Sequence, residues 1–86
     1  AFPNPFNPDT NLSFTLVNAV EELSLGIYDI QGALIQTLSS GHHEKGTHGF
    51  MWNGHDSRAT VVSSGVYLVR LSTGSNQQIQ RVTLIR

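Results

Sequence analysis

Apolar and polar side chains alternate along most of this chain after its first nine residues. A repeat of two places alternate side chains on the same face of a β-strand, and turn-forming residues separate the runs. No segment shows a sustained helical repeat. The predicted strands cover residues 10–17, 23–30, 33–38, 48–52, 65–71 and 78–85. Short strands with frequent turn signals predict an all-β, antiparallel fold, either a sandwich or a small barrel.

The last predicted strand has an irregular pattern. Ile79 is out of phase with Val82 and Leu84, so the three side chains do not share one face of a regular strand. An extra residue in the strand would restore the phase. The pattern therefore predicts a bulge or bend near Gln80 and Arg81.

The first nine residues differ from the rest of the chain. All three prolines lie among the first eight residues, and two of them follow asparagine, a combination that favours turns and extended backbone. We therefore predict that residues 1–9 are a lead-in at the end of a linker and that residues 10–86 form the sandwich. Phe6, in the lead-in, is expected to plug one end of the sandwich.

Three aromatic residues are predicted to be structural. Phe14, Trp52 and Tyr67 are each in phase with the apolar positions of their strands, so they should pack in the core. Truncation of such a buried aromatic side chain typically costs about 3–5 kcal/mol. The phase of Tyr28 is ambiguous. If Tyr28, Trp52 and Tyr67 faced outward instead, they could form a flat platform for a carbohydrate.

Composition excludes several classes of function. The 86 residues are enough for one domain. The net charge of −1, with scattered basic residues, predicts no binding of nucleic acid. No apolar stretch approaches the roughly 20 residues that span a bilayer, so we expect no insertion into a membrane. The absence of cysteine excludes disulfides and thiolate chemistry. The chain starts at Ala1 without a signal peptide, so an exported domain of this kind is expected to follow an upstream domain.

The histidines raise the possibility of a metal site. His42, His43 and His48 lie near Glu44 in the sequence. A zinc site needs ligands that converge, whereas adjacent residues of an extended segment point to opposite sides. A half-buried, hydrogen-bonded histidine at the start of a strand accounts for His48. We therefore expect no metal site and no cofactor.

No arrangement typical of catalysis is present. The serines lack the strand–turn–helix context of a nucleophile, and no carboxylates are paired as an acid and a base. Asp29 and Asp56 are better explained as turn-forming residues, although oxygen-rich loops of this kind sometimes bind calcium. The chain is therefore expected not to be an enzyme.

Six short motifs occur in a recognisable order. They are PNPFNP at 3–8, LSFTL at 12–16, IYDIQG at 27–32, GTH at 46–48, WNG at 52–54 and SGVYLVRL at 64–71. In this order the chain resembles the C-terminal sorting domain of proteins exported by the bacterial type IX secretion system. It is also similar to the immunoglobulin-like domain of flagellar hook-capping proteins. Both resemblances imply an immunoglobulin-like antiparallel β-sandwich of about seven strands.

The sorting-domain resemblance implies a function and partners. The domain would direct an upstream cargo domain through the outer membrane, where the secretion translocon recognises it and a surface peptidase removes it. The protein would then be secreted or held at the cell surface after passing through the periplasm. The resemblance places recognition on the fifth and last strands. For the last strand this is physically reasonable, because it is an edge or near-edge element and an exposed edge can be read by strand addition. The recognition residues would be Gly65, Tyr67, Arg70, Arg81, Val82, Leu84 and Arg86.

Three alternatives stay open at this point. The chain could be a carbohydrate-binding accessory module of an extracellular enzyme, a structural spacer in such an enzyme, or the hook-capping relative. One departure from the sorting-domain pattern concerns the loop after Trp52. Many relatives have a second glycine there, whereas residues 53–59 contain only Gly54. This loop is therefore expected to differ in turn type, while the strand motifs are unaffected.

Overall fold

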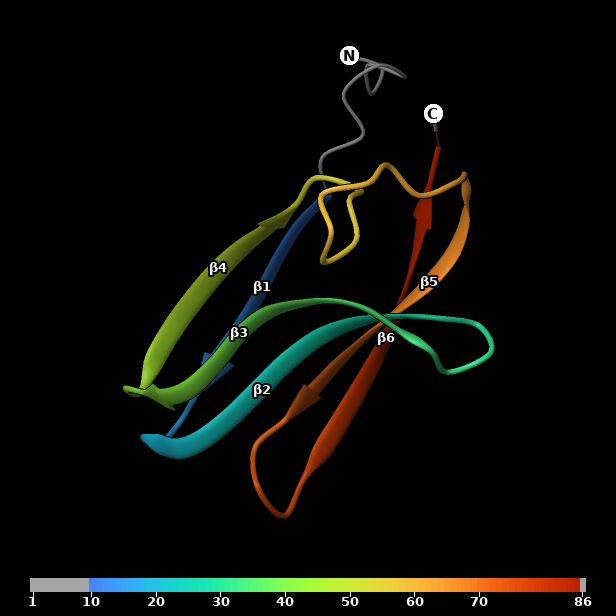
Figure 1. Cartoon of the computed structure of the whole chain (residues 1–86). Coiled ribbons are helices and arrows are strands. Elements are labelled where there is room, and N and C mark those ends of the chain that lie inside the picture. The colour runs from blue at the N-terminus through green and yellow to red at the C-terminus, as the bar shows by residue number, and fades with distance from the viewer. Residues whose placement is uncertain (1–9, 86) are drawn as a thin grey trace.

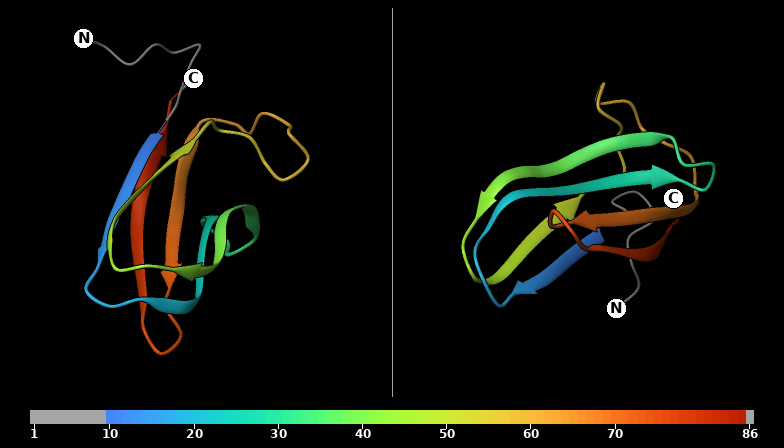
Figure 2. Two further views of the ribbon diagram at one scale, coloured as in Figure 1. Left: turned by 90° about the vertical axis from the view of Figure 1, so that its left-hand side faces the viewer. Right: turned by 90° about the horizontal axis from the view of Figure 1, so that it is seen from below.

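The computed structural model describes residues 10–85, and within them all the regular structure is β-strand. The strands are β1 (Thr10–Leu16), β2 (Val20–Asp29), β3 (Leu34–His43), β4 (Gly46–Trp52), β5 (Gly65–Ser72) and β6 (Gln77–Leu84). Strands β1 and β4 form one antiparallel sheet, and a second antiparallel sheet has the order β3-β2-β5-β6. The two sheets face each other (Figure 1, Figure 2). The prediction of an all-β antiparallel sandwich is confirmed, with six described strands where about seven were expected.

The core lies between the two sheets and follows the alternation seen in the sequence. Each strand except β3 contributes at least one fully buried apolar side chain, and partly buried side chains such as Phe14 pack around them. The buried residues are Leu12, Leu16, Leu23, Leu25, Ile27, Trp52, Tyr67, Val69, Leu71 and Leu84. Core positions were correctly predicted for Trp52 and Tyr67. Phe6, the predicted plug, lies outside the described residues.

The predicted bulge in the last strand is wrong. The pairing of β5 with β6 runs without a register shift from Gly65 opposite Leu84 to Ser72 opposite Gln77. Ile79 is out of phase because it faces away from the core, and 61% of its surface is exposed. The register shifts occur instead between β2 and β3, at three places.

Strand β3 is longer than predicted. The alternating pattern ended at Leu38, but backbone pairing with β2 continues to His43. Residues 39–43 are serines, a glycine and histidines, which carry no apolar repeat. An edge strand needs only one neighbour and buries little surface, so its extent leaves a weak signal in the sequence.

The chain begins β1 and ends β6 at the same end of the sandwich (Figure 1). No described residue belongs to a helix with the length and hydropathy needed to cross a bilayer.

Candidate functional site

The outward side of the four-stranded sheet carries an unusual set of side chains. Strand β5 directs Tyr67, Val69 and Leu71 into the core, so its alternate residues Leu68 and Arg70 point outward. Strand pairing aligns residues of β2, β3 and β6 with these two positions. We define the outer face as Tyr28, Leu34, Leu68, Arg70, Ile79 and Arg81.

Tyr28 and Arg70 form the centre of the outer face. The guanidinium carbon of Arg70 lies 4.5 Å from the centroid of the Tyr28 ring. Arg70 Nη2 also donates a hydrogen bond of 3.1 Å to the Tyr28 hydroxyl. Gly26, directly opposite Arg70 on β2, makes room for this arrangement. A Cβ atom at Gly26 would lie 3.1 Å from Tyr28 Cε1 and 3.3 Å from Leu34 Cδ1, tighter than ordinary van der Waals contact.

The residues predicted for recognition do not share one surface. Tyr67 and Leu84 are buried, and Val82 is half-buried beside the core. Arg70 and Arg81 lie on the outer face: Arg81 pairs with Leu68 across β5 and β6, and Arg70 is two residues after Leu68 on β5. Gly65 starts β5, and Arg86 lies outside the described residues. A recognition role for these residues stays a prediction.

The loop between β4 and β5 is fixed at both ends by the aromatic pair Trp52 and Tyr67. Trp52 Nε1 donates a 2.9 Å hydrogen bond to the carbonyl of His55, and the Tyr67 hydroxyl donates one of 2.7 Å to the carbonyl of Ser63. A tyrosine near the start of a strand that bonds backbone a few residues upstream is a known feature of immunoglobulin-like sandwiches.

Asp56 organises the middle of the same loop. Its carboxylate accepts hydrogen bonds from the backbone N–H groups of Arg58 and Thr60, at 2.9 and 3.0 Å. The bond from Thr60 is the main cause that lowers the pKa of Asp56 below its usual value. The loop also covers part of the β3 edge, because Ser57 N–H donates to the carbonyl of Ile35 at 2.9 Å.

The missing second glycine of this loop has a structural counterpart. Ala59 adopts a φ of 63°, the left-handed conformation that favours glycine. It is the sole non-glycine residue with positive φ among residues 10–85. The loop therefore contains a glycine-type turn position without a glycine.

The predicted turn roles of Asp29 and Asp56 are confirmed. Asp29 Oδ1 accepts backbone hydrogen bonds from Gln31 and Ala33, both at 2.9 Å. Each carboxylate therefore stabilises the turn that follows it by accepting hydrogen bonds from backbone N–H groups. Across the part of the chain that the structure describes, no three His, Asp or Glu side chains converge in a way that could hold a metal ion.

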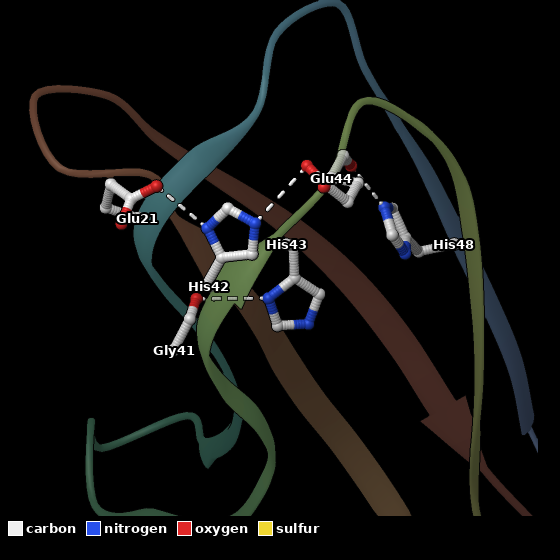
Figure 3. Close-up of polar contacts among 6 residues, drawn as sticks. All are labelled: Glu21, Gly41, His42, His43, Glu44 and His48. Atoms are coloured by element: carbon white, nitrogen blue, oxygen red, sulfur yellow. Dashed lines mark hydrogen bonds and ion pairs between the residues drawn. The ribbon is translucent and has the colours of Figure 1, made fainter.

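His42 and His43 point in opposite directions, as the extended backbone predicted (Figure 3). His42 Nδ1 lies 2.8 Å from Glu21 Oε1, and its Nε2 lies 3.3 Å from Glu44 Oε2. These two exposed carboxylates, Glu21 first, raise the pKa of His42 above 6.5. His42 therefore links the start of β2 to the turn between β3 and β4 through its contacts with these two carboxylates.

His43 and His48 lie on the opposite side of β3 from His42. His43 Nδ1–H donates to the Gly41 carbonyl at 3.1 Å, so its Nε2 accepts from Ser39 Oγ at 2.8 Å. His48 is half-buried, and its Nε2–H donates to the carbonyl of Glu44 at 2.7 Å. Its ring stacks on Phe14 with centroids 5.5 Å apart. The structural role predicted for His48 is confirmed.

A groove separates β1 from β6, the two strands that border one open side of the sandwich. It has a volume of about 250 Å³, and its lining includes Leu12, Phe14, Leu71, Gln78 and Ile79. None of its lining residues carries a charge or titrates near neutral pH. The groove therefore supplies no titratable acid or base, and its one hydroxyl, on Ser13, has none beside it.

The two-sheet sandwich and the loop anchored by Tyr67 together define an immunoglobulin-like module. A family model described as FlgD Ig-like domain matches residues 4–77, so the chain belongs to this family. Among solved structures, the crystal structure of FLGD from P. Aeruginosa is similar, with a TM-score of 0.67 and 21% sequence identity. The similar region covers 88% of this chain and 59% of that one. No curated protein matched the sequence.

The family match corrects the predicted function. Assignment as a type IX sorting domain is wrong, because the matched family is the immunoglobulin-like domain of FlgD. The predicted route to the cell surface through the periplasm, which depended on that function, is wrong for the same reason. So is the alternative of a carbohydrate-binding or spacer module of an extracellular enzyme. The expected partners, a translocon, a surface peptidase and an upstream cargo domain, are tested by no observation and stay predictions.

The error has a physical source. Motifs such as WNG and SGVYLVRL place Trp52 and Tyr67 in the core and anchor the loop between them. They therefore report how the sandwich is built, and both families that the sequence resembles share that sandwich. Motifs that specify packing identify the fold more reliably than the function.

Proposed function

We propose that this chain acts as the immunoglobulin-like module of a flagellar hook-capping protein, as a non-catalytic part of the scaffold on which the hook is assembled. The observation that supports the proposal most directly is the family match, which extends over residues 4–77. The similarity of its fold to FLGD agrees with this family. The match covers only 59% of the FLGD chain. The activity of a whole hook-capping protein is therefore proposed for this chain and does not follow from the match itself.

The chemistry of the described residues supports a structural role. The carboxylates of Asp29 and Asp56 are engaged in their own turns, and the paired His42 is exposed beside Glu21. By contrast, the outer face combines tyrosine, arginine and aliphatic side chains. Tyrosine and arginine are enriched in protein–protein interfaces.

The proposal is tested by deleting the encoding gene in the source organism and imaging hooks by electron microscopy. We expect deletion to remove assembled hooks and swimming motility, and a plasmid copy to restore both. A copy with Trp52→Ala should fail because the core loses its largest buried side chain, whereas Glu22→Gln, an exposed change, should complement fully. Normal hooks in the deletion strain would overturn the proposal.

A further inference from the structure

We propose that the outer face is the surface by which this module binds a protein partner that presents carboxylates next to apolar side chains. The proposal rests on the function proposed above in one respect, namely that the assembled hook is taken as that partner. It goes further in naming the surface and the chemistry of the contact.

The apolar part of the outer face is exposed and spans the whole four-stranded sheet. Leu34 and Ile79 expose 56% and 61% of their surfaces, and Tyr28 and Leu68 are half-buried between them. These side chains come from four adjacent strands of one sheet, so they form a continuous rigid platform. A rigid platform loses little conformational entropy when a partner binds to it.

The charge of the outer face determines the partner's chemistry. Arg70 and Arg81 form no ion pair with any described residue. The residues that face them across the neighbouring strands are Gly26, Ile79 and Leu68, none of which is acidic. Two guanidinium groups without carboxylate partners, set among apolar side chains, are complementary to carboxylates on a partner surface.

Arg70 is already positioned for such a contact. Tyr28 holds the guanidinium both through its ring and through its hydroxyl, which engages only Nη2. The other N–H groups of the fork remain available to a carboxylate, which arginine binds in a bidentate geometry. Glycine inside a strand is unfavourable, yet Gly26 lies under Tyr28 where a Cβ atom would crowd the ring. Gly26 is therefore unfavourable for the strand itself, but it leaves room for the Tyr28–Arg70 pair.

The test measures co-sedimentation of the full 86-residue chain with hooks purified from the source organism, at 50 and 300 mM NaCl. We expect saturable binding that weakens at the higher salt concentration. The double variant Arg70→Gln and Arg81→Gln should raise the Kd at least tenfold. The matched control, Lys45→Gln with Arg58→Gln, makes the same change in net charge at two residues that do not belong to the outer face, and should leave the Kd within twofold.

Two further variants separate binding from folding and probe the apolar part. Arg81→Gln alone removes a side chain that makes no hydrogen bond or ion pair within the described residues, so it should leave thermal unfolding unchanged and raise the Kd about threefold. Leu34→Ser should weaken binding, whereas Val17→Ser, at an exposed site in another part of the chain, should not.

The possible failures are distinguishable. If the wild-type chain binds hooks and the Arg70 and Arg81 variants bind them equally well, the proposal for this surface is overturned. The proposed hook-capping function is then unaffected. Absence of wild-type binding would overturn both. Self-association of the chain in sedimentation velocity, abolished by Arg81→Gln, would show that a second copy occupies the outer face and would also overturn the proposal.

Discussion

The Trp52 indole meets the Tyr67 ring edge to face, with ring centroids 5.1 Å apart and an interplanar angle of 67°. The two residues belong to different sheets, because Trp52 ends β4 and Tyr67 lies in β5. Their contact therefore joins the two layers of the sandwich. The polar atom of each side chain bonds the loop that connects these strands, so one pair fixes both the packing of the sheets and the path of the loop.

The hydroxyl of Tyr67 should contribute measurably to stability. Tyr67→Phe keeps the packing against Trp52 but removes the hydrogen bond to Ser63, which should lower the free energy of unfolding by about 1 kcal/mol. Urea unfolding followed by the fluorescence of Trp52, the sole tryptophan of the chain, measures the change. Tyr28→Phe removes a hydroxyl at a more exposed site and should cost less. Equal effects of the two variants would contradict the role assigned to Tyr67.

Ala59→Gly should stabilise the protein. A left-handed conformation costs a non-glycine residue about 1–2 kcal/mol, and the greater freedom of glycine in the unfolded chain offsets about 0.4–1 kcal/mol of the gain. We expect a net increase in the free energy of unfolding of about 0.5–1 kcal/mol, measured by urea denaturation. The control is Ala33→Gly, at an exposed position without positive φ, which should be destabilising. A loss of stability for both variants would show that Ala59 is not strained.

The contact between Glu21 and His42 should make stability depend on pH. The raised pKa of His42 means that the folded state binds the proton more tightly than the unfolded state. The resulting stabilisation is fully present below pH 6.5 and disappears as the pH rises through the folded pKa. Glu21→Gln should therefore lower the urea midpoint more at pH 5.5 than at pH 8.5, by a small amount because the pair is exposed.

Glu22→Gln is the matched control for this experiment, because Glu22 is adjacent and exposed but does not contact His42. Titration of His42 by NMR should give a lower pKa in Glu21→Gln than in the wild-type chain and no change in Glu22→Gln. An unchanged pKa in Glu21→Gln would show that the ion pair does not form in solution.

The sequence predicted the parts of the fold that depend on local alternation. Leu12, Leu23 and Trp52 lie where a repeat of two places them, because each strand buries one face. The repeat gave no information where burial is weak, and so the extension of β3 to His43 was missed. The bulge near Gln80 and Arg81 was predicted wrongly because Ile79 was assumed to face the core. Its apolar side chain faces outward, so it alternates regularly with the buried positions of the strand.

The outer face could not be predicted in the same way. Tyr28 and Arg70 meet only because β2 pairs with β5 in one particular register, and this register is set by strands far apart in the sequence. A weak signal was present in Gly26, two residues before Tyr28, since a glycine inside a strand often marks a close approach. The function was misassigned because the motifs used for it specify packing.

The pairing order also constrains how the chain assembles. Strands β2 and β3 form a local hairpin, as do β5 and β6, whereas Thr10 pairs with Trp52 and Tyr28 with Leu68 only after long loops close. Pairings between distant segments slow folding, to milliseconds or seconds in small sandwiches of this kind. A two-stranded sheet is marginal by itself, so β1 and β4 should join last, on a preformed four-stranded sheet. If unfolding reverses this order, β1 and β4 detach first. The backbone amides that pair β1 with β4 should then exchange with solvent sooner than those that pair β2 with β5.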